Sequence, residues 1–215
     1  MERSIHFEFK AQYFQSSAIS PDTREVWFVL HGYGQLAKHF IKKFNPIASR
    51  ERVIVAPGGL SRFYLEGFNG RVGATWMTKE ERLVDIDNYM SYLNQVYGEV
   101  TSNFEPEQKV DFHFLGFSQG AATVTRFLQW HQHDFKRLIV WAGSFPHDME
   151  VAKLSDKLKG KEVVMVRGNQ DPFIDSDSIE QQRFFIDSLG IDVTDITFDG
   201  KHEINNECLM KLAKL

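Results

Sequence analysis

Short hydrophobic runs alternate along the chain with longer stretches in which hydrophobic and polar positions recur at helical spacing. Six of these runs end in glycine and are predicted to be strands: residues 25–32, 52–58, 110–116, 136–143, 162–168 and 192–200. The middle runs show little alternation, which is typical of strands that are covered on both faces of a parallel sheet. The opening segment, residues 4–14, alternates more strictly and is predicted to form an edge strand or a hairpin.

The segments between these runs carry helical patterns. The clearest pattern follows residues 76–81, where Thr78 and Glu81 have the spacing of a capping box. One apolar stripe follows at steps of three and four residues: Leu83, Ile86, Met90, Leu93 and Tyr97. Further helices are predicted over residues 36–48, 119–132, 177–189 and 205–214. Strands that alternate with helices predict one α/β domain over residues 1–215, with a mainly parallel sheet covered by helices on both faces.

Composition narrows the class of protein further. The 215 residues are 42% hydrophobic and 25% charged, which is ordinary for a globular domain. A net charge of −4 without a long basic run argues against a nucleic-acid partner. The single cysteine, Cys208, excludes an internal disulfide and a multi-cysteine metal site, and it is expected to be a small buried residue. We expect no membrane span, since no stretch approaches about 18 apolar residues, and we expect a cytoplasmic protein.

Ligands of such sheets bind beyond the carboxyl ends of the strands, so functional residues are expected in the turns there. One of these turns reads GFSQG, in which Ser118 lies two residues from Gly116 and from Gly120. The pattern G-x-S-x-G is weak by itself, but here it joins a predicted strand to a predicted helix. That context predicts a nucleophile elbow, a tight turn that lifts the serine Oγ clear of the sheet.

A nucleophilic serine needs a base, and the base needs an acid that orients it. In this type of fold the order along the chain is serine, acid, histidine. His202 follows the last predicted strand and is the one histidine in the required place. Asp171 follows its strand directly and is the favoured acid, whereas Asp175 and Asp177 compete but are explained by a helix start.

The remaining histidines have structural explanations. His113 lies five residues before the serine in the same strand, roughly 16 Å away at about 3.3 Å per residue, and is expected to be a hydrogen-bonded core histidine. His131 and His133 form an H-x-H pattern without further metal ligands nearby. His147 precedes the acid in the chain, and His31 is expected to brace its loop.

Two backbone N–H groups are expected to form an oxyanion hole. One belongs to Gln119, the residue after the serine. The other belongs to Tyr33, in the loop LHGYGQ, where Gly32 and Gly34 allow the backbone to turn toward the site.

The motifs LHGYG, APGG, GFSQGAA, SFP, GNQDPFI and GKHEI together resemble the phospholipase/carboxylesterase family of α/β-hydrolases, which includes acyl-protein thioesterases, lysophospholipases and small bacterial carboxylesterases. The resemblance extends from about residue 25 to the end of the chain. It implies the α/β-hydrolase fold, a catalytic triad of Ser118, Asp171 and His202, and oxyanion donors at Tyr33 and Gln119. It implies no metal and no cofactor.

The chain departs from the family pattern in two places. It has HGYGQ where many members have HGLGD, and residues 62–82 replace a tryptophan-rich loop of the thioesterase branch. Four aromatic residues near these loops are candidates for an acyl pocket, with plain packing as the alternative: Phe68, Trp76, Phe145 and Phe173. Trp27, Trp130 and Trp141 lie in regular elements and are expected in the core.

The sequence therefore predicts a serine esterase that hydrolyses carboxylic esters of small to medium acyl chains through an acyl-enzyme. A lysophospholipase or an acyl-protein thioesterase acting on long chains is the alternative, and a non-catalytic binding protein on the same fold is a remote one. The expected partner is a small-molecule ester or thioester, and a homodimer is left open.

Overall fold

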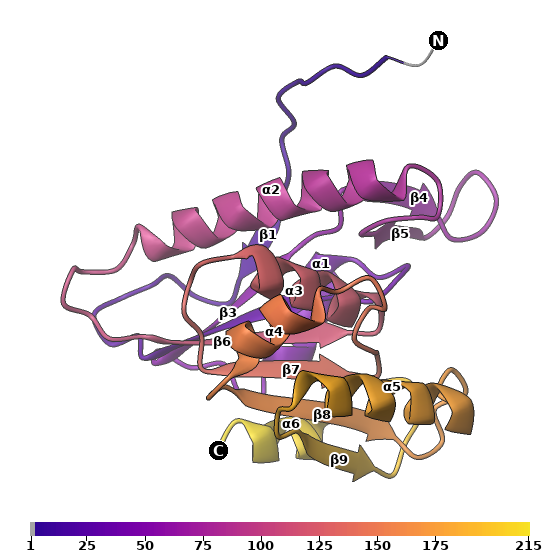
Figure 1. Ribbon diagram of the computed structural model, residues 1–215. Coiled ribbons are helices and arrows are strands. Elements are labelled where there is room, and N and C mark those ends of the chain that lie inside the picture. Colours follow the sequence, from indigo (N-terminus) through magenta and orange to yellow (C-terminus); the bar gives the residue numbers. More distant parts are fainter. Residues whose placement is uncertain (1–2) are drawn as a thin grey trace.

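The computed structural model describes residues 3–215 and is built around one seven-stranded sheet (Figure 1). The strand order is β1-β3-β2-β6-β7-β8-β9, and only β1 runs antiparallel to its neighbour. The strands are β1 (Tyr13–Gln15), β2 (Glu25–Leu30), β3 (Arg52–Pro57), β6 (Asp111–Phe117), β7 (Arg137–Trp141), β8 (Glu162–Gly168) and β9 (Thr194–Phe198). The predicted mainly parallel sheet is confirmed.

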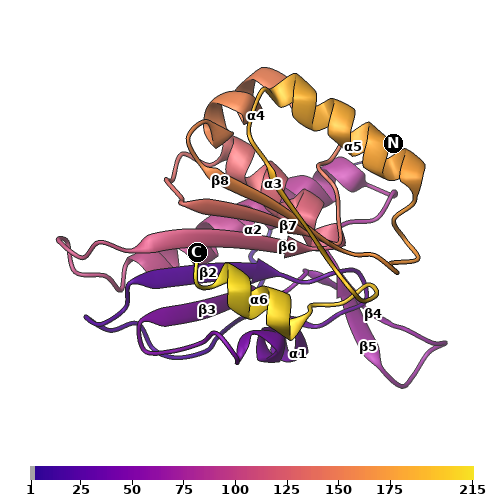
Figure 2. The same cartoon turned by 90° about the horizontal axis from the view of Figure 1, so that it is seen from below.

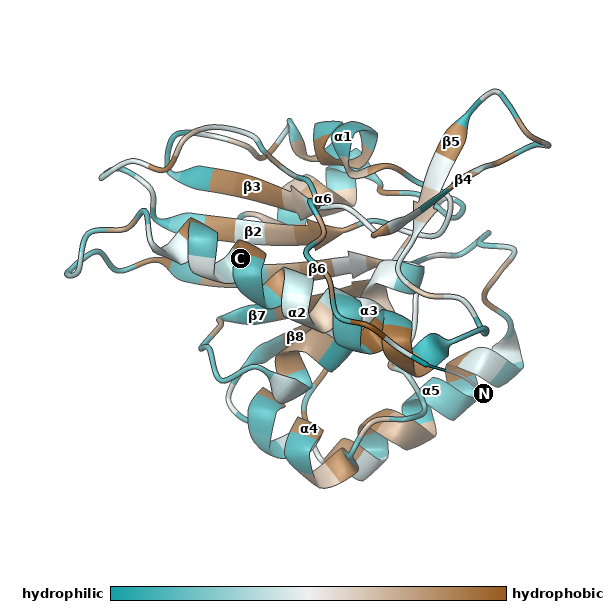
Figure 3. Cartoon of the chain, turned by 90° about the horizontal axis from the view of Figure 1, so that it is seen from above, coloured by the Kyte–Doolittle hydropathy of each residue, from teal (hydrophilic) through white to brown (hydrophobic). Residues whose placement is uncertain are grey.

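Helices cover both faces of this sheet. On one face lie α2 (Arg82–Thr101), α3 (Gln119–Trp130), α4 (Val151–Leu158) and α5 (Ser176–Leu189). On the other face lie α1 (Ala37–Phe40), the 3₁₀ helix η1 (Ile41–Phe44) and α6 (Asn206–Leu212) (Figure 2). The central strands are strongly hydrophobic while the helices mix hydrophobic and polar positions, as expected when helices bury only one side (Figure 3). Among the helices of residues 3–215, none is both long enough and apolar enough to span a membrane.

A small hairpin lies beside the main sheet and was not predicted from the sequence. It pairs β4 (Ser61–Tyr64) with β5 (Val72–Thr75). A bridge between Gln35 and Ala74 attaches it to the loop that follows β2. The strands of this hairpin are short, and β4 is largely exposed, so they carry little of the hydrophobic pattern that marks a strand.

Two expectations about the ends of elements were wrong. The opening segment does lead into the expected edge strand, but that strand, β1, covers only residues 13–15, and within residues 3–215 the backbone of residues 4–11 pairs with nothing. The Thr78–Glu81 pair is not a capping box, because α2 begins only at Arg82, after Glu81 at a φ of 47°. The backbone N–H of Thr78 instead donates to Oδ2 of Asp85 at 3.1 Å.

The buried face of α2 also lies further along the helix than predicted. Leu93 and Tyr97 are buried as expected, but Leu83 is exposed. Four further residues complete the buried face: Tyr89, Tyr92, Val96 and Val100. The first turn of the helix extends past the core, so the apolar residues in that turn are not buried.

Of the tryptophans expected in the core, Trp27 and Trp141 are fully buried, but Trp130 is exposed. Trp130 ends α3, and the ammonium group of Lys153 lies 4.2 Å from its ring centroid. A cation over an exposed indole explains how this ring is accommodated at the surface.

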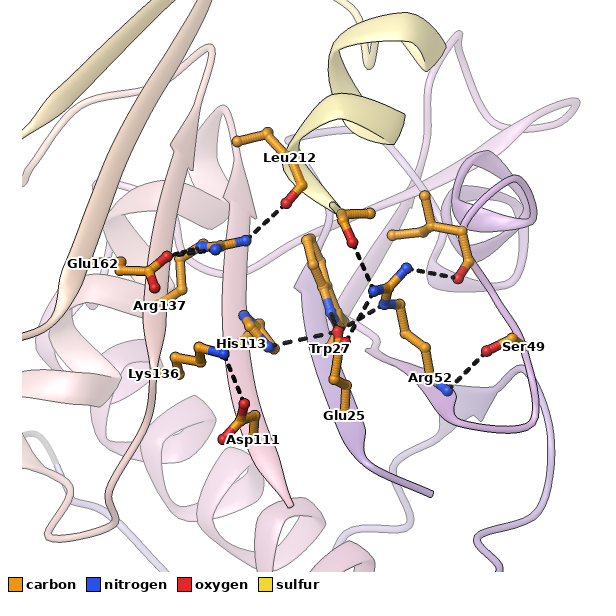
Figure 4. Close-up of polar contacts among 12 residues, drawn as sticks. Glu25, Trp27, Ser49, Arg52, Asp111, His113, Lys136, Arg137, Glu162 and Leu212 are labelled. Atoms are coloured by element: carbon orange, nitrogen blue, oxygen red, sulfur yellow. Dashed lines mark hydrogen bonds and ion pairs between the residues drawn. The ribbon is translucent and has the colours of Figure 1, made fainter. Parts of the chain in front are cut away.

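Two arginines fix the C-terminal end of α6 against the sheet (Figure 4). Arg52 on β3 donates to the carbonyl of Ala213 at 2.7 Å, and Arg137 on β7 donates to the carbonyl of Leu212 at 2.8 Å. The last carbonyls of a helix lack partners within the helix, so these guanidinium groups satisfy them. The helix that follows the His202 loop is thereby held at its far end.

His113 lies beside this cluster, and the expectation that it is hydrogen-bonded was wrong. Its ring stacks on Trp27 with 4.9 Å between centroids, and neither ring nitrogen has a hydrogen-bond partner. The nearest charge is Oε2 of Glu25, at 3.7 Å from Nε2. Burial lowers the pKa of His113 from 6.5 to about 4, so the ring is neutral at pH 7.

Candidate active site

Ser118 occupies the turn between β6 and α3, with a φ of 54° and a ψ of −119°. A positive φ is strained for a residue that has a Cβ, and such strain persists only where the surroundings enforce it. Here the N–H of Ser118 donates to the carbonyl of Trp141 at 2.9 Å, and its own carbonyl accepts from Ala121 at 3.0 Å. The neighbouring strand and the new helix therefore hold the serine in the strained conformation.

Glycines make this close turn sterically feasible. A Cβ on Gly116 would lie 2.3 Å from the carbonyl oxygen of Gly120, and a Cβ on Gly120 would lie 2.3 Å from that of Leu30. A third glycine was not linked to the turn by its sequence pattern: a Cβ on Gly143 would lie 2.6 Å from the carbonyl oxygen of Ser118. Any side chain at these positions would force the backbone apart.

Asp171 and His202 meet at the carboxyl edge of the sheet. Oδ2 of Asp171 lies 2.7 Å from Nδ1 of His202, and the carboxylate is fully buried. The other carboxylate oxygen, Oδ1, accepts from the N–H of Phe173 at 3.0 Å. These contacts fix the carboxylate on both oxygens and hold the imidazole at Nδ1, which leaves Nε2 for other chemistry.

The two competing aspartates have the structural role expected of them. Asp175 is the N-cap of α5, and its side chain accepts a hydrogen bond from the N–H of Ser178. In return, the N–H of Asp175 donates to the hydroxyl oxygen of Ser178. Asp177 lies in the first turn of the same helix. Neither is paired with a histidine.

The loop that carries His202 is held from two sides. Trp141 on β7 donates from its indole Nε1 to the carbonyl of Glu203 at 2.9 Å. From the loop next to Asp171, the N–H of Gln170 donates to Gly200 O at 2.9 Å, and Asn169 Oδ1 accepts from Gly200 N at 3.2 Å. Sequence reasoning had placed Trp141 only in the core. Its hydrogen bond joins two residues that are far apart in the sequence, and no local sequence pattern indicates such a contact.

The loop after β2 is braced by His31, as expected. Nδ1 of this buried ring lies 2.8 Å from the carbonyl of Gly32, and Nε2 accepts from the N–H of Gly59 at 2.9 Å. This pair of contacts assigns the proton to Nδ1. Burial lowers the pKa of His31 to about 4, so the ring is a neutral brace rather than a charged group.

The amides of Tyr33 and Gln119 are both without an intramolecular acceptor within residues 3–215. The loop of Tyr33 is close to the serine, since a Cβ on Gly32 would lie 3.1 Å from Cβ of Ser118. The side chain of Tyr33 is exposed and packs on Phe63. The side chain of Gln119 instead bonds to the end of β5: its Oε1 accepts from Trp76 N at 3.1 Å, and its Nε2 donates to Met77 O at 2.8 Å.

A cavity of about 740 Å³ runs from the serine to the space beneath α5. Ser118, Gln119 and His202 line one end, and aliphatic side chains from β8, α5 and the start of β9 line the other, including Met165, Ile186 and Val193. The interior also holds charged groups, among them the ion pair of Arg167 and Asp195 at 2.8 Å.

Of the four aromatic residues considered for an acyl pocket, only Phe173 lines this cavity, where its ring lies edge-on against His202 at 4.8 Å. Phe68 is almost fully exposed on the β4–β5 connection. Trp76 is buried and donates from its indole to the carbonyl of His31, and Phe145 is buried against Phe185. The aliphatic lining was missed because no sequence motif marks it.

Within residues 3–215 no three His, Cys, Asp or Glu side chains are grouped so that they could hold a metal ion. His131 and His133, the H-x-H pair, stack on each other at 4.0 Å, and His133 stacks on Tyr97 at the same distance. The pair is therefore explained by packing.

The parallel sheet, the serine turn and the histidine–aspartate pair at its carboxyl edge define an α/β-hydrolase. The chain belongs to the phospholipase/carboxylesterase family, whose model it matches over residues 16–215. This confirms the resemblance inferred from the motifs and places the chain among the hydrolases of carboxylic esters. None of the curated proteins compared with the chain matches it significantly in sequence.

Solved structures share this fold at low sequence identity. Acyl-protein thioesterase 2 of Zea mays has a TM-score of 0.70 at 13% identity, over 95% of this chain and 97% of the thioesterase. A phospholipase/carboxylesterase of Dyadobacter fermentans has a TM-score of 0.68 at 18% identity, over 97% of both chains. The carboxylesterase of Bacillus cereus has a TM-score of 0.66 at 17% identity, over 95% of this chain and 92% of that enzyme.

Proposed function

We propose that the protein is a serine esterase that cleaves its substrate through an acyl-enzyme on Ser118. The observation that carries the proposal is the hydrogen bond of Asp171 with His202, whose ring lines the same cavity as the strained Ser118. In this mechanism Nε2 of His202 accepts the hydroxyl proton as Oγ of Ser118 attacks the carbonyl carbon. The same nitrogen then donates the proton to the leaving alcohol or thiol, and water repeats the sequence to release the acid.

Each remaining part of the site has a role in this proposal. Asp171 keeps the imidazole in one tautomer and stabilises its transient positive charge. The amides of Gln119 and Tyr33 donate to the oxyanion, and the absence of another acceptor for them within residues 3–215 supports this role. Removing one such donor typically costs about 3–4 kcal/mol of transition-state stabilisation.

The proposed substrate is a carboxylic ester or thioester with a small to medium acyl chain. The aliphatic side chains beneath α5 favour an acyl group over a sugar or a nucleotide, and the ion pair of Arg167 and Asp195 disfavours a long uninterrupted chain. The size of the cavity keeps the alternative, a lysophospholipase or acyl-protein thioesterase, as the second candidate.

We further propose that the enzyme works without metal or cofactor on a small-molecule substrate in the cytoplasm. A single, buried cysteine is compatible with a reducing compartment.

The direct test is hydrolysis of p-nitrophenyl butyrate by the Ser118→Ala variant. We expect turnover to fall to background while the melting temperature stays near that of the parent protein. Ser144→Ala is the matched control, since Ser144 lines the same cavity but lies in the loop after β7 rather than on the elbow. An equal loss of turnover in Ser118→Ala and Ser144→Ala, or retained turnover in Ser118→Ala, would show that Ser118 is not the nucleophile. A parent protein that turns over no ester would favour the non-catalytic binding alternative.

A further inference from the structure

Residues 4–11 form an arm without regular secondary structure that leads away from the body of the molecule beyond α2 (Figure 1), while Phe9 and Ala11 at its base line a cavity with Leu36 and Arg62. The arm precedes the stretch that matches the family, which begins at residue 16. Its hydrophobic residues alternate with His6, Glu8 and Lys10, which is the pattern of a strand with one apolar face. That face is open to solvent: Ile5 is 85% exposed, Phe7 75% and Phe9 54%.

The arm leads directly into the edge strand of the sheet. Backbone pairing along this part of the chain begins at Gln12, whose carbonyl accepts from Gly58 N at 3.2 Å, and continues through β1. Within residues 3–215, no backbone hydrogen bond is made by residues 4–11. Unpaired backbone that continues an edge strand and carries an apolar stripe is a template for pairing with another strand.

We propose that this arm is a self-association surface, and that its partner is the arm of a second copy of this chain. Antiparallel pairing about a twofold axis through Phe7 places Phe7 opposite its equivalent and Ile5 opposite Phe9. The same register places Glu8 opposite His6 and Lys10 opposite Ser4. The three exposed apolar side chains of each arm, Ile5, Phe7 and Phe9, then meet apolar side chains of the other, and the acidic residue meets a residue that is not acidic.

Neighbouring registers are less favourable. A shift by one residue places the apolar side chains of one arm against the polar side chains of the other. A shift by two residues in one direction pairs Phe7 with Phe9 but sets Glu8 directly opposite Glu8, and like charges in that position are destabilising. A shift by two in the other direction leaves Phe9 without an apolar partner. The sequence of the arm is thus complementary to itself in one register.

The first test is the molar mass of the full chain in solution, measured by light scattering over a range of protein concentrations. We expect the mass to rise toward twice the 24.9 kDa of one chain as the concentration increases. The Phe7→Glu variant is expected to stay monomeric, with unchanged ester hydrolysis. Phe68→Glu is the matched control, because it places the same charge at another exposed phenylalanine, on the β4–β5 connection.

The second test determines the register by cross-linking. Cys208, the only native cysteine, is buried, so any cross-link forms at a cysteine that is introduced into the arm. In the proposed register the two residues at position 7 are directly opposite each other, at a separation that a disulfide between Phe7→Cys residues can bridge. The two residues at position 8 are diagonal neighbours, roughly 7–8 Å apart, so Glu8→Cys residues are too far apart for a disulfide. We expect Phe7→Cys to form a disulfide dimer on mild oxidation, and Glu8→Cys to do so only when mixed with His6→Cys.

Two results would overturn the proposal: a parent protein that remains monomeric at every concentration, or cross-linking that is equal at positions 7 and 8. Neither result bears on the catalytic proposal, because the arm is remote from Ser118 in the sequence and contributes nothing to its cavity.

Discussion

The indole Nε1 of Trp141 lies 2.9 Å from the carbonyl oxygen of Glu203, the residue that follows His202. Trp141 is fully buried on β7, the strand whose last carbonyl also accepts the N–H of Ser118. One residue therefore contacts the serine turn through its backbone and the histidine loop through its side chain. We infer that Trp141 is a positioning residue for His202, the proposed base.

Replacing Trp141 by phenylalanine is expected to lower kcat while KM changes little. The substitution removes the N–H and leaves most of the aromatic packing, so the histidine loop loses one restraint. Small misplacements of a catalytic group cost about 10- to 100-fold in rate. The measurement is steady-state hydrolysis of a p-nitrophenyl ester.

Trp27→Phe supplies the control. Trp27 is also fully buried, and its indole donates to Oε2 of Glu25 at 3.0 Å, away from the site. Each variant loses one buried hydrogen bond and is expected to lose about 1–3 kcal/mol of stability. If kcat falls equally in both, the effect is general destabilisation and the positioning role is wrong.

Asp171→Asn is expected to reduce kcat strongly without unfolding the protein. The amide has nearly the same shape, but it presents a donor to the imidazole and favours the wrong tautomer. In serine hydrolases such a change costs about 10³- to 10⁴-fold. Asp175→Asn should leave activity in place, because asparagine caps a helix as well as aspartate does. An active Asp171→Asn enzyme would indicate that another group orients His202.

Filling the cavity beneath α5 is expected to shorten the preferred acyl chain. Ile186→Trp places a larger side chain against Met165 and Val193, where the distal part of an acyl group would lie. We expect octanoate hydrolysis to fall at least about 10-fold relative to acetate hydrolysis. Phe184→Trp, on the exposed side of α5, should leave the ratio of the two rates unchanged. An unchanged ratio in Ile186→Trp would place the acyl group elsewhere.

His113→Phe is expected to stabilise the protein, and increasingly so as the pH falls. The ring is buried beside Glu25 and Arg137 without a hydrogen bond, and burial lowers its pKa from 6.5 to about 4. Between these values the unfolded chain binds a proton that the folded chain does not, so the parent loses stability as the pH drops from 6.5 toward 4. One proton corresponds to about 1.4 kcal/mol for each pH unit.

Denaturation of parent and His113→Phe at several pH values measures this difference directly. Other buried histidines titrate in both proteins, so the difference between the two isolates His113. A difference in unfolding free energy that does not change between pH 7 and pH 4.5 would contradict the assigned pKa.

The main sheet was predictable because its buried parallel strands form continuous apolar runs, such as residues 162–168. The positions of Ser118, Asp171 and His202 at one edge of the sheet were predictable for a related reason: each lies shortly after the end of a strand of that sheet. The contact between Asp171 and His202 follows from this topology.

Other features could not be read from the sequence. The contact between Trp141 and Glu203 depends on how two distant segments pack, and a tryptophan in a strand carries no mark of its hydrogen-bond partner. The cavity beneath α5 depends on how closely that helix approaches the sheet, so Ile186 looked like any other apolar helical residue. Phe68 illustrates the reverse error, since its position in an aromatic-rich loop suggested a pocket but the hairpin carries it into solvent.

The most direct test of the central claim is the site at which a fluorophosphonate probe reacts, located by mass spectrometry of the digested protein. The account predicts one adduct per chain, on Ser118, with labelling that is lost in Ser118→Ala and strongly slowed in His202→Ala. An adduct on another residue, or no adduct on a folded protein, would contradict it.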